Sequence, residues 1–279
     1  MFNPFSWAFG MGAPEPPGVL EIRRRSPSGA AFRTPLVFVH GAFVGAWCWD
    51  EHFLGYLSGR GFHTVAPSLR GHGGSAGDLQ RSGVADYVAD LESVVAELDT
   101  PPVLIGHSMG GLVVQKYLER HACRAAVLMA SVPPTGLVQS TLRLLLGDPM
   151  LFTQLTFMQG LGPGAVNAEI ARRAVFSDHL SAADLARFSR YMQPESQRAL
   201  WDMTAGALPR PWQMDVPPML VMAAAGDTLF SVREAEGAAR RYNAELHVEP
   251  EMAHAMMLEP GWRNVADRLV DWLAAQGVE

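Results

Sequence analysis

A pentapeptide of the form Gly-x-Ser-x-Gly lies between an apolar run and a stretch with helical spacing. The pentapeptide is Gly106–Gly110, the run is Val103–Ile105 and the stretch is Gly111–Leu118. We expect a buried strand that turns sharply into a helix, with glycines where the two approach too closely for a side chain. Ser108 then takes a strained conformation, and its hydroxyl stands clear of the backbone above the end of a sheet. The pentapeptide therefore predicts a strand–helix unit with a candidate nucleophile at the turn.

Apolar runs bounded by turn residues alternate with helical patterns along most of the chain. Strands are expected over residues 19–22, 36–39, 63–66, 103–105, 125–129, 219–222 and 245–248. Helical spacing falls near residues 49–57, 84–98, 111–120, 232–242 and 262–273. This alternation predicts an α/β fold with a mostly parallel central sheet flanked by helices on both faces.

The alternation stops between Pro133 and about Pro218. Candidate helices without a clear strand occupy residues 139–146, 165–176, 182–192 and 197–205. A helical insertion within an α/β sheet is most simply a cap over the site. We therefore divide the chain into an irregular N-terminal segment (1–18), an α/β core (19–133 and 215–279) and a helical cap (134–214).

Composition excludes several classes of function. A chain of 279 residues with 48% hydrophobic residues can bury a substantial core, and its net charge of −6 offers no basic surface for nucleic acid. No stretch approaches the length of a membrane span, and no Lys or Arg precedes Arg23, so a signal peptide is not expected. Two cysteines, Cys48 and Cys123, predict free thiols and a reducing, cytoplasmic location. Oligomeric state is not predicted.

A serine hydroxyl needs a base to become a nucleophile, and the base needs an orienting carboxylate. In parallel sheets such groups gather at the carboxyl ends of strands. Asp227 closely follows the expected strand 219–222, and His254 lies in the loop after strand 245–248. The chain order Ser108, Asp227, His254 is the order expected for a Gly-x-Ser-x-Gly turn in such a sheet. We predict that these three residues form a catalytic triad.

Other residues compete for two of these roles. His247 is a second candidate base, but its neighbours on the strand alternate inward and leave it facing outward, which favours His254. Asp202 and Asp215 compete with Asp227, and both lie inside or at the edge of the insertion. Both carboxylates remain open as alternatives.

Four separate motifs lie in order along the chain: His40-Gly41-Ala42-Phe43, Arg70–Ser75, Gly106–Gly110, and Asp227 with His254. In these motifs the chain resembles the α/β-hydrolase fold superfamily. The segment Trp47–Trp49 is similar to a branch with small serine esterases, lysophospholipase-like hydrolases and plant methylesterases. The resemblance implies an α/β-hydrolase fold with an inserted cap and hydrolysis by an activated serine.

An oxyanion hole needs two backbone N–H groups that point at one position. Met109 supplies one from a helix N-terminus, where free donors and the helix dipole favour negative charge. The resemblance assigns the other to the loop after His40-Gly41, where we choose Ala42 and keep Phe43 as an alternative. Cys, His and carboxylates do not cluster with metal-ligand spacing, and the loop Arg70–Ser75 lacks both phosphate-binding fingerprints. We therefore expect no metal and no cofactor.

Three histidines near these motifs, His40, His72 and His107, are interpreted as packing or hydrogen-bonding residues. In the insertion, the large apolar residues are Phe152, Phe157, Met158, Met192, Trp201, Met203, Trp212 and Met214. They predict an adaptable apolar pocket, with about half of them serving only to pack the cap.

The sequence therefore predicts a serine hydrolase for carboxylic esters. Ser108 attacks the acyl carbonyl, His254 transfers the proton to the leaving alcohol, and Asp227 orients the imidazole. Water then releases the acid, so a lipophilic small-molecule ester and water are the only expected partners. A carbon–carbon bond hydrolase, an acyltransferase or perhydrolase, and a ligand receptor with little turnover remain alternatives. An aspartate-nucleophile enzyme, such as an epoxide hydrolase, is excluded because position 108 is serine.

Overall fold

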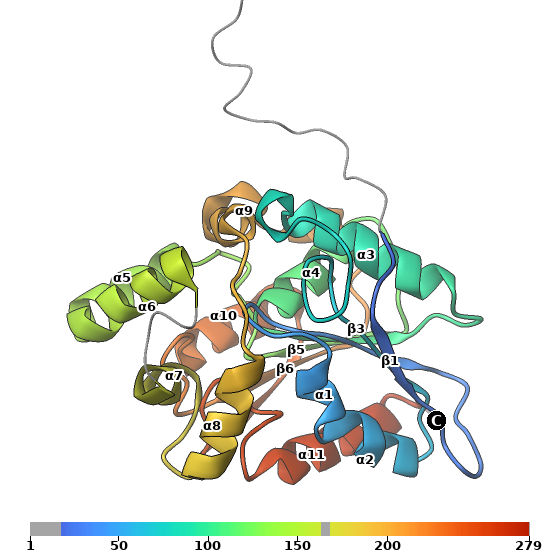
Figure 1. Cartoon of the computed structure of the whole chain (residues 1–279). Coiled ribbons are helices and arrows are strands. Elements are labelled where there is room, and N and C mark those ends of the chain that lie inside the picture. Colours follow the sequence, from blue (N-terminus) through green and yellow to red (C-terminus); the bar gives the residue numbers. More distant parts are fainter. Residues whose placement is uncertain (1–17, 163–167, 279) are drawn as a thin grey trace, which may run out of the picture.

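The computed structural model describes residues 18–162 and 168–278 of the chain (Figure 1). The expected irregular segment 1–18 lies outside these residues except for Gly18. One sheet has the strand order β1-β3-β2-β4-β5-β6-β7. Its strands are β1 (Ile22–Arg25), β2 (Leu36–Val39), β3 (Thr64–Pro67), β4 (Val103–His107), β5 (Ala125–Met129), β6 (Met219–Ala224) and β7 (Glu245–Glu249). β1 is antiparallel to β3 and all other pairs are parallel, which confirms the predicted fold class.

The expected position of the first strand is wrong, whereas the other strands differ only at their ends. The strand was expected over 19–22, but β1 begins at Ile22, which pairs with Pro67, and continues through arginines. Arg23 and Arg25 form ion pairs with Asp50 at 2.9 and 2.8 Å. β1 is an edge strand, where charged side chains reach water and discourage pairing with another chain. A charged edge strand lacks the apolar run by which the central strands are recognised.

Helices cover both faces of the sheet (Figure 1). One face carries α1 (Trp47–Asp50), α2 (Phe53–Gly59) and α11 (Trp262–Ala275), and the other carries α3 (Val84–Ala96), α4 (Met109–Tyr117) and α10 (Val232–Tyr242). Leu36 and Phe38 of β2 pack into the core on the α11 side, and their neighbours Val37 and Val39 pack into the core on the opposite side. Because both faces are buried, the central strands have nearly continuous apolar sequences.

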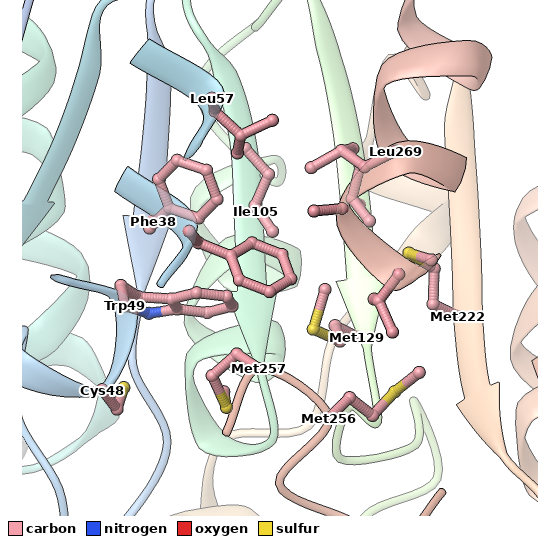
Figure 2. Packing of buried hydrophobic residues seen from close by; sticks show 14 of the residues in the cluster. Phe38, Cys48, Trp49, Leu57, Ile105, Met129, Met222, Met256, Met257 and Leu269 are labelled. Atoms are coloured by element: carbon pink, nitrogen blue, oxygen red, sulfur yellow. The ribbon is translucent and has the colours of Figure 1, made fainter. Parts of the chain in front are cut away.

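The core on the α11 side contains large interlocking side chains (Figure 2). Phe38 lies with its ring centroid 5.0 Å from that of Trp49, and both residues are fully buried. Ile105, just before the Gly-x-Ser-x-Gly turn, and Leu269 of α11 belong to the same cluster. The turn after β4 therefore begins at a strand that is anchored in the buried core.

The segment between β5 and β6, here called the insert, is helical. It contains α5 (Val138–Gly147), α6 (Pro149–Leu161), α7 (Ala168–Val175), α8 (Ala182–Tyr191) and α9 (Gln197–Trp201), with a π-helical turn over Asp202–Gly206. Single 3₁₀ turns occur at Leu79–Arg81 and Pro211–Gln213. The four expected helices correspond to α5, α7, α8 and α9, and the expected start of α7 at 165 lies outside the described residues.

Helix α6 was not expected, because its apolar residues do not form one stripe. Its first turn does carry helix-start signals. The side chain of Asp148 accepts the N–H of Leu151 at 3.0 Å, and Pro149 occupies the first turn. These signals, rather than periodicity, are what identify α6 in the sequence.

Cys48 and Cys123 are unpaired. Over residues 18–162 and 168–278, no helix combines the length and apolar character that crossing a membrane requires.

Candidate active site

The turn between β4 and α4 has the expected strained geometry. Ser108 has φ 52° and ψ −116°, a left-handed conformation that is unusual for a residue other than glycine. A Cβ atom at Gly106 would lie 2.4 Å from the carbonyl oxygen of Gly110, and one at Gly110 would lie 2.2 Å from that of Val39. Both glycines are therefore required by close backbone contacts, and Ser108 lies at the apex.

Asp227 and His254 meet at the carboxyl ends of β6 and β7. Nδ1 of His254 lies 2.8 Å from Oδ2 of Asp227, and both side chains are almost fully buried. Oδ1 of Asp227 accepts the N–H groups of Leu229 and Phe230 at 2.8 and 3.0 Å. The carboxylate thus accepts a hydrogen bond from Nδ1–H, which leaves the lone pair of the imidazole on Nε2. His254 and Ser108 line the same cavity.

The competing residues lie elsewhere. His247 bonds Glu249 at 3.0 Å on β7. Asp202 accepts the N–H of Val84 at 2.9 Å and thereby caps the start of α3. Asp215 is exposed and precedes the amino end of β6, at the opposite edge of the sheet. Of the candidate acids, the structure brings only Asp227 to His254.

The loop after β2 passes directly beside Ser108. A Cβ atom at Gly41 would lie 3.0 Å from the Cβ of Ser108. Within the described residues, no protein acceptor takes the N–H of Ala42 or of Met109. The N–H of Phe43, in contrast, donates to Oε2 of Glu195 at 3.3 Å. This contact favours Ala42 over Phe43 as the donor from this loop.

Two buried histidines near the site are held neutral. His40 accepts the N–H of Leu69 at Nε2 and donates to the carbonyl of Gly41 from Nδ1, and burial lowers its pKa to about 3. Burial also lowers the pKa of His107 well below its usual value. Nε2 of His107 donates to the backbone carbonyl of His254 at 3.0 Å. Both act as hydrogen-bonding residues, and His107 fastens the loop that carries His254.

Two cavities meet at Ser108. The His254-side cavity has a volume of about 120 Å³ and is also lined by His254. The α5-side cavity has a volume of about 140 Å³ and is not lined by His254. They share a wall made of Ala42, Phe43, Ser108, Leu155, Gln159 and Leu229. Among the described lining residues there is no Asp, Glu, Lys or Arg.

The insert supplies much of the remaining lining. On the His254 side the distinctive residues include Trp47, Met158, Val175, Phe188, Met192 and Met257. On the α5 side they include Leu137, Thr141, Leu144, Phe152, Leu200 and Met203. Four of the eight large apolar residues singled out in the sequence therefore line the cavities. The expectation that the others only pack the cap is wrong for Phe157, Trp201 and Trp212, which are exposed.

One part of the site was not expected from the sequence. Glu195 and Gln193, between α8 and α9, bond the loops after β2 and β3. Their segment has neither periodicity nor a known motif, so no local signal identifies them. Across the described residues, no group of three His, Cys, Asp or Glu side chains is placed to hold a metal ion.

Fold and site together define an α/β-hydrolase. The chain belongs to the alpha/beta hydrolase family, whose sequence profile matches residues 36–268. The resemblance proposed from the motifs is thereby confirmed.

Individual relatives cover different shares of the chain. A non-heme haloperoxidase from Rhodococcus erythropolis is 38% identical over 104 residues, which are 36% of this chain and 38% of that protein. The chain thus spans well under half of the haloperoxidase that it matches. A pFDCC methylesterase from Arabidopsis thaliana is 30% identical over 213 residues, 71% of this chain and 79% of that protein. An esterase from Exiguobacterium antarcticum has the same fold, with a TM-score of 0.71 at 17% identity over 91% of this chain and 95% of its own.

Proposed function

We propose that this protein is a serine hydrolase that cleaves carboxylic esters through an acyl-enzyme. The observation that carries the proposal is the buried hydrogen bond from His254 to Asp227, together with a cavity lined by both His254 and the strained Ser108. Family membership and the similarity to a plant methylesterase support it.

The proposed reaction uses main-chain and side-chain groups of this chain. Nε2 of His254 takes the proton of the Ser108 hydroxyl as its oxygen attacks the ester carbonyl. The N–H groups of Ala42 and Met109 stabilise the oxyanion of the tetrahedral intermediate. His254 then gives the proton to the departing alcohol. A water molecule, deprotonated by His254, attacks the acyl-enzyme and releases the acid and free Ser108.

The cavities favour a lipophilic, uncharged substrate. Their described walls are mostly apolar and hold no carboxylate, ammonium or guanidinium group that could pair with a substrate charge. The two unpaired cysteines support a cytoplasmic location for the protein.

Covalent labelling and ester turnover test the proposal. We expect a fluorophosphonate to label Ser108 and p-nitrophenyl esters to release p-nitrophenol with a burst. Ser108→Ala should abolish both, whereas Ser93→Ala, a change in α3, should alter neither. Folded protein that does not label would contradict the proposal. Labelling without turnover on a broad ester panel would instead favour the carbon–carbon hydrolase or the receptor.

A second candidate function is perhydrolysis, which the similarity to non-heme haloperoxidases favours. Hydrogen peroxide would replace water as the acceptor of the acyl group, which yields a peracid and free enzyme. Peracid formation from an acetate ester and hydrogen peroxide, measured beside acetate release, separates the two functions. A peracid yield no greater than that of the Ser108→Ala variant would refute this second function.

A further inference from the structure

The two cavities that meet at Ser108 are small and similar in size. Their volumes are about 120 and 140 Å³. An engineered protein cavity of about 150 Å³ holds one benzene molecule. Each cavity therefore suits a group of about the size of one ring, and neither suits a long fatty chain.

The position of His254 distinguishes the two cavities. In ester cleavage the leaving oxygen must lie beside the imidazole that protonates it. His254 lines only one cavity, together with Ala255, Met257 and Leu258 from the same loop. The alcohol portion of the ester therefore belongs in the His254-side cavity. The acyl portion then extends past Leu229 into the α5-side cavity.

We propose that the substrate is a compact, uncharged ester with an apolar group of about one ring on each side of the carboxyl. The alcohol group occupies the His254-side cavity and the acyl group occupies the α5-side cavity. This assignment rests on the proposed esterase function and adds the substrate class and orientation to it.

Two isomeric esters and two matched variants test the assignment. Benzyl acetate carries its ring on the alcohol, and methyl phenylacetate carries its ring on the acid. Val175→Phe narrows the His254-side cavity, and Leu144→Phe narrows the α5-side cavity. We expect Val175→Phe to lower kcat/KM for benzyl acetate by roughly tenfold or more and to spare methyl phenylacetate. Leu144→Phe should show the reverse preference.

Each outcome has a distinct meaning. The opposite pattern would overturn the orientation, and equal effects on both isomers would overturn the two-cavity assignment. Efficient cleavage of hexadecanoate esters would also overturn this assignment. The same holds if the protein hydrolyses p-nitrophenyl acetate but cleaves neither benzyl acetate nor methyl phenylacetate. Fluorophosphonate labelling of Ser108 is measured in parallel. If the wild type is not labelled, the esterase proposal itself is refuted. Labelling therefore distinguishes a failure of the esterase proposal from a failure of the substrate assignment.

A separate network of hydrogen bonds joins the insert to the loop that carries Ala42. Glu195 is 1% exposed. Its Oε2 accepts from Nε2 of His72 at 3.0 Å and from the N–H of Phe43 at 3.3 Å. Its Oε1 accepts from the hydroxyl of Tyr87 at 3.0 Å and from the N–H of Ser196 at 2.7 Å. One carboxylate thus receives four donors, three of which come from segments more than a hundred residues away in the sequence.

Phe43 is held at both of its backbone groups. Its carbonyl accepts the N–H of Gln193 at 2.9 Å, while its N–H donates to Glu195. Its φ of 66° is a left-handed conformation that costs free energy and persists only when surrounding contacts impose it. Phe43 directly follows Ala42, so these contacts limit the directions that the N–H of Ala42 can take.

The charges around Glu195 are arranged to keep it ionised. Nδ1 of His72 donates to the carbonyl of Arg70 at 3.2 Å, and Nε2 donates to the carboxylate, so both ring nitrogens act as donors. Burial works to raise the pKa of Glu195, but the interaction with His72 and the other donors outweighs it, and the pKa is lowered.

The geometry points to Glu195 as a positioning residue that aims the oxyanion loop. This inference also rests on the proposed function. An amide at this position keeps the shape of the side chain but places N–H groups against donors, so Glu195→Gln should disturb the loop. We expect kcat for p-nitrophenyl acetate to fall by roughly tenfold or more with KM within about threefold, since an oxyanion donor acts in the transition state.

Glu259→Gln is the matched control. Glu259 is also 1% exposed, and it accepts from the N–H and hydroxyl of Ser177, away from the oxyanion loop. Both variants should lower the melting temperature, but only Glu195→Gln should weaken inhibition by a trifluoromethyl ketone, which forms an oxyanion at the active serine. Tyr87→Phe, which removes a single donor to Glu195, gives a milder test if Glu195→Gln does not fold. Of Glu195→Gln and Tyr87→Phe, the variant that folds is compared with the wild type. If its kcat and its inhibition by the ketone equal those of the wild type, Glu195 has only a structural role.

Discussion

Replacing Asp227 with Asn changes one hydrogen bond of the proposed triad and keeps the others. Oδ1 of Asp227 accepts the N–H groups of Leu229 and Phe230, so the oxygen of an asparagine would remain at that position. The amide nitrogen would then face Nδ1 of His254, 2.8 Å from Oδ2 in the native protein, and donate to it. Nδ1 becomes an acceptor and the ring proton moves to Nε2. His254 then has no lone pair with which to take the proton of Ser108.

The same exchange lowers kcat about 10⁴-fold in a serine protease, and we expect a fall of about this size here. It corresponds to about 5 kcal/mol of lost transition-state stabilisation. Turnover of p-nitrophenyl acetate measures the effect, and thermal unfolding should stay near that of the wild type because both N–H groups remain bonded.

Asp202→Asn serves as the control for this prediction. Asp202 accepts the N–H of Val84 at the start of α3, and the oxygen of an asparagine can still accept it, so both the stability and kcat should stay near those of the wild type. Near-normal turnover in a folded Asp227→Asn variant would refute the reasoning and require another acid.

Three further changes test the packing around the site. Gly110→Ala should prevent folding or abolish activity, because its Cβ would lie 2.2 Å from the carbonyl oxygen of Val39; expression and circular dichroism check this. Phe38→Ala should lower the free energy of unfolding by about 3–5 kcal/mol in urea denaturation, since it empties a fully buried site beside Trp49. The pKa of His40 is about 3 in the folded protein, so below pH 6.5 the unfolded chain binds the proton first. The stability that depends on His40 should therefore fall between pH 7 and pH 5, by at most about 1.4 kcal/mol per pH unit, so total stability should fall less steeply in His40→Gln.

Much of the core was predictable because its signals are local. Central strands buried on both faces appear as apolar runs, and β2, β4 and β5 lie where those runs predict them. The signal for the turn at Ser108 is likewise local. The glycines on either side are required by close contacts within one strand–helix unit and with its neighbouring strand. β1 was displaced and α6 was missed for the converse reason. A charged edge strand and a helix without one apolar stripe carry weak periodic signals.

The candidate triad was predictable from chain order, because parallel strands bring their carboxyl ends to one edge of the sheet. Sequence order could not choose among carboxylates in other loops. That choice came from the contact between Asp227 and His254, and from the different bonds of Asp202. The preference for Ala42 over Phe43 arose in the same way, since only the fold brings Glu195 to the N–H of Phe43.

By itself, the sequence determined the α/β fold, the strained turn and the order of the candidate catalytic residues, because these follow from local patterns and from the order of those patterns along the chain. Only the tertiary structure decided which loop donors remain free, where Glu195 lies, and how two small cavities divide the space at Ser108. These features depend on contacts between the insert and the core, such as that of Glu195 with Phe43, whose residues lie more than a hundred positions apart in the sequence. No local pattern encodes such contacts, so they appear only when the insert and the sheet are packed together.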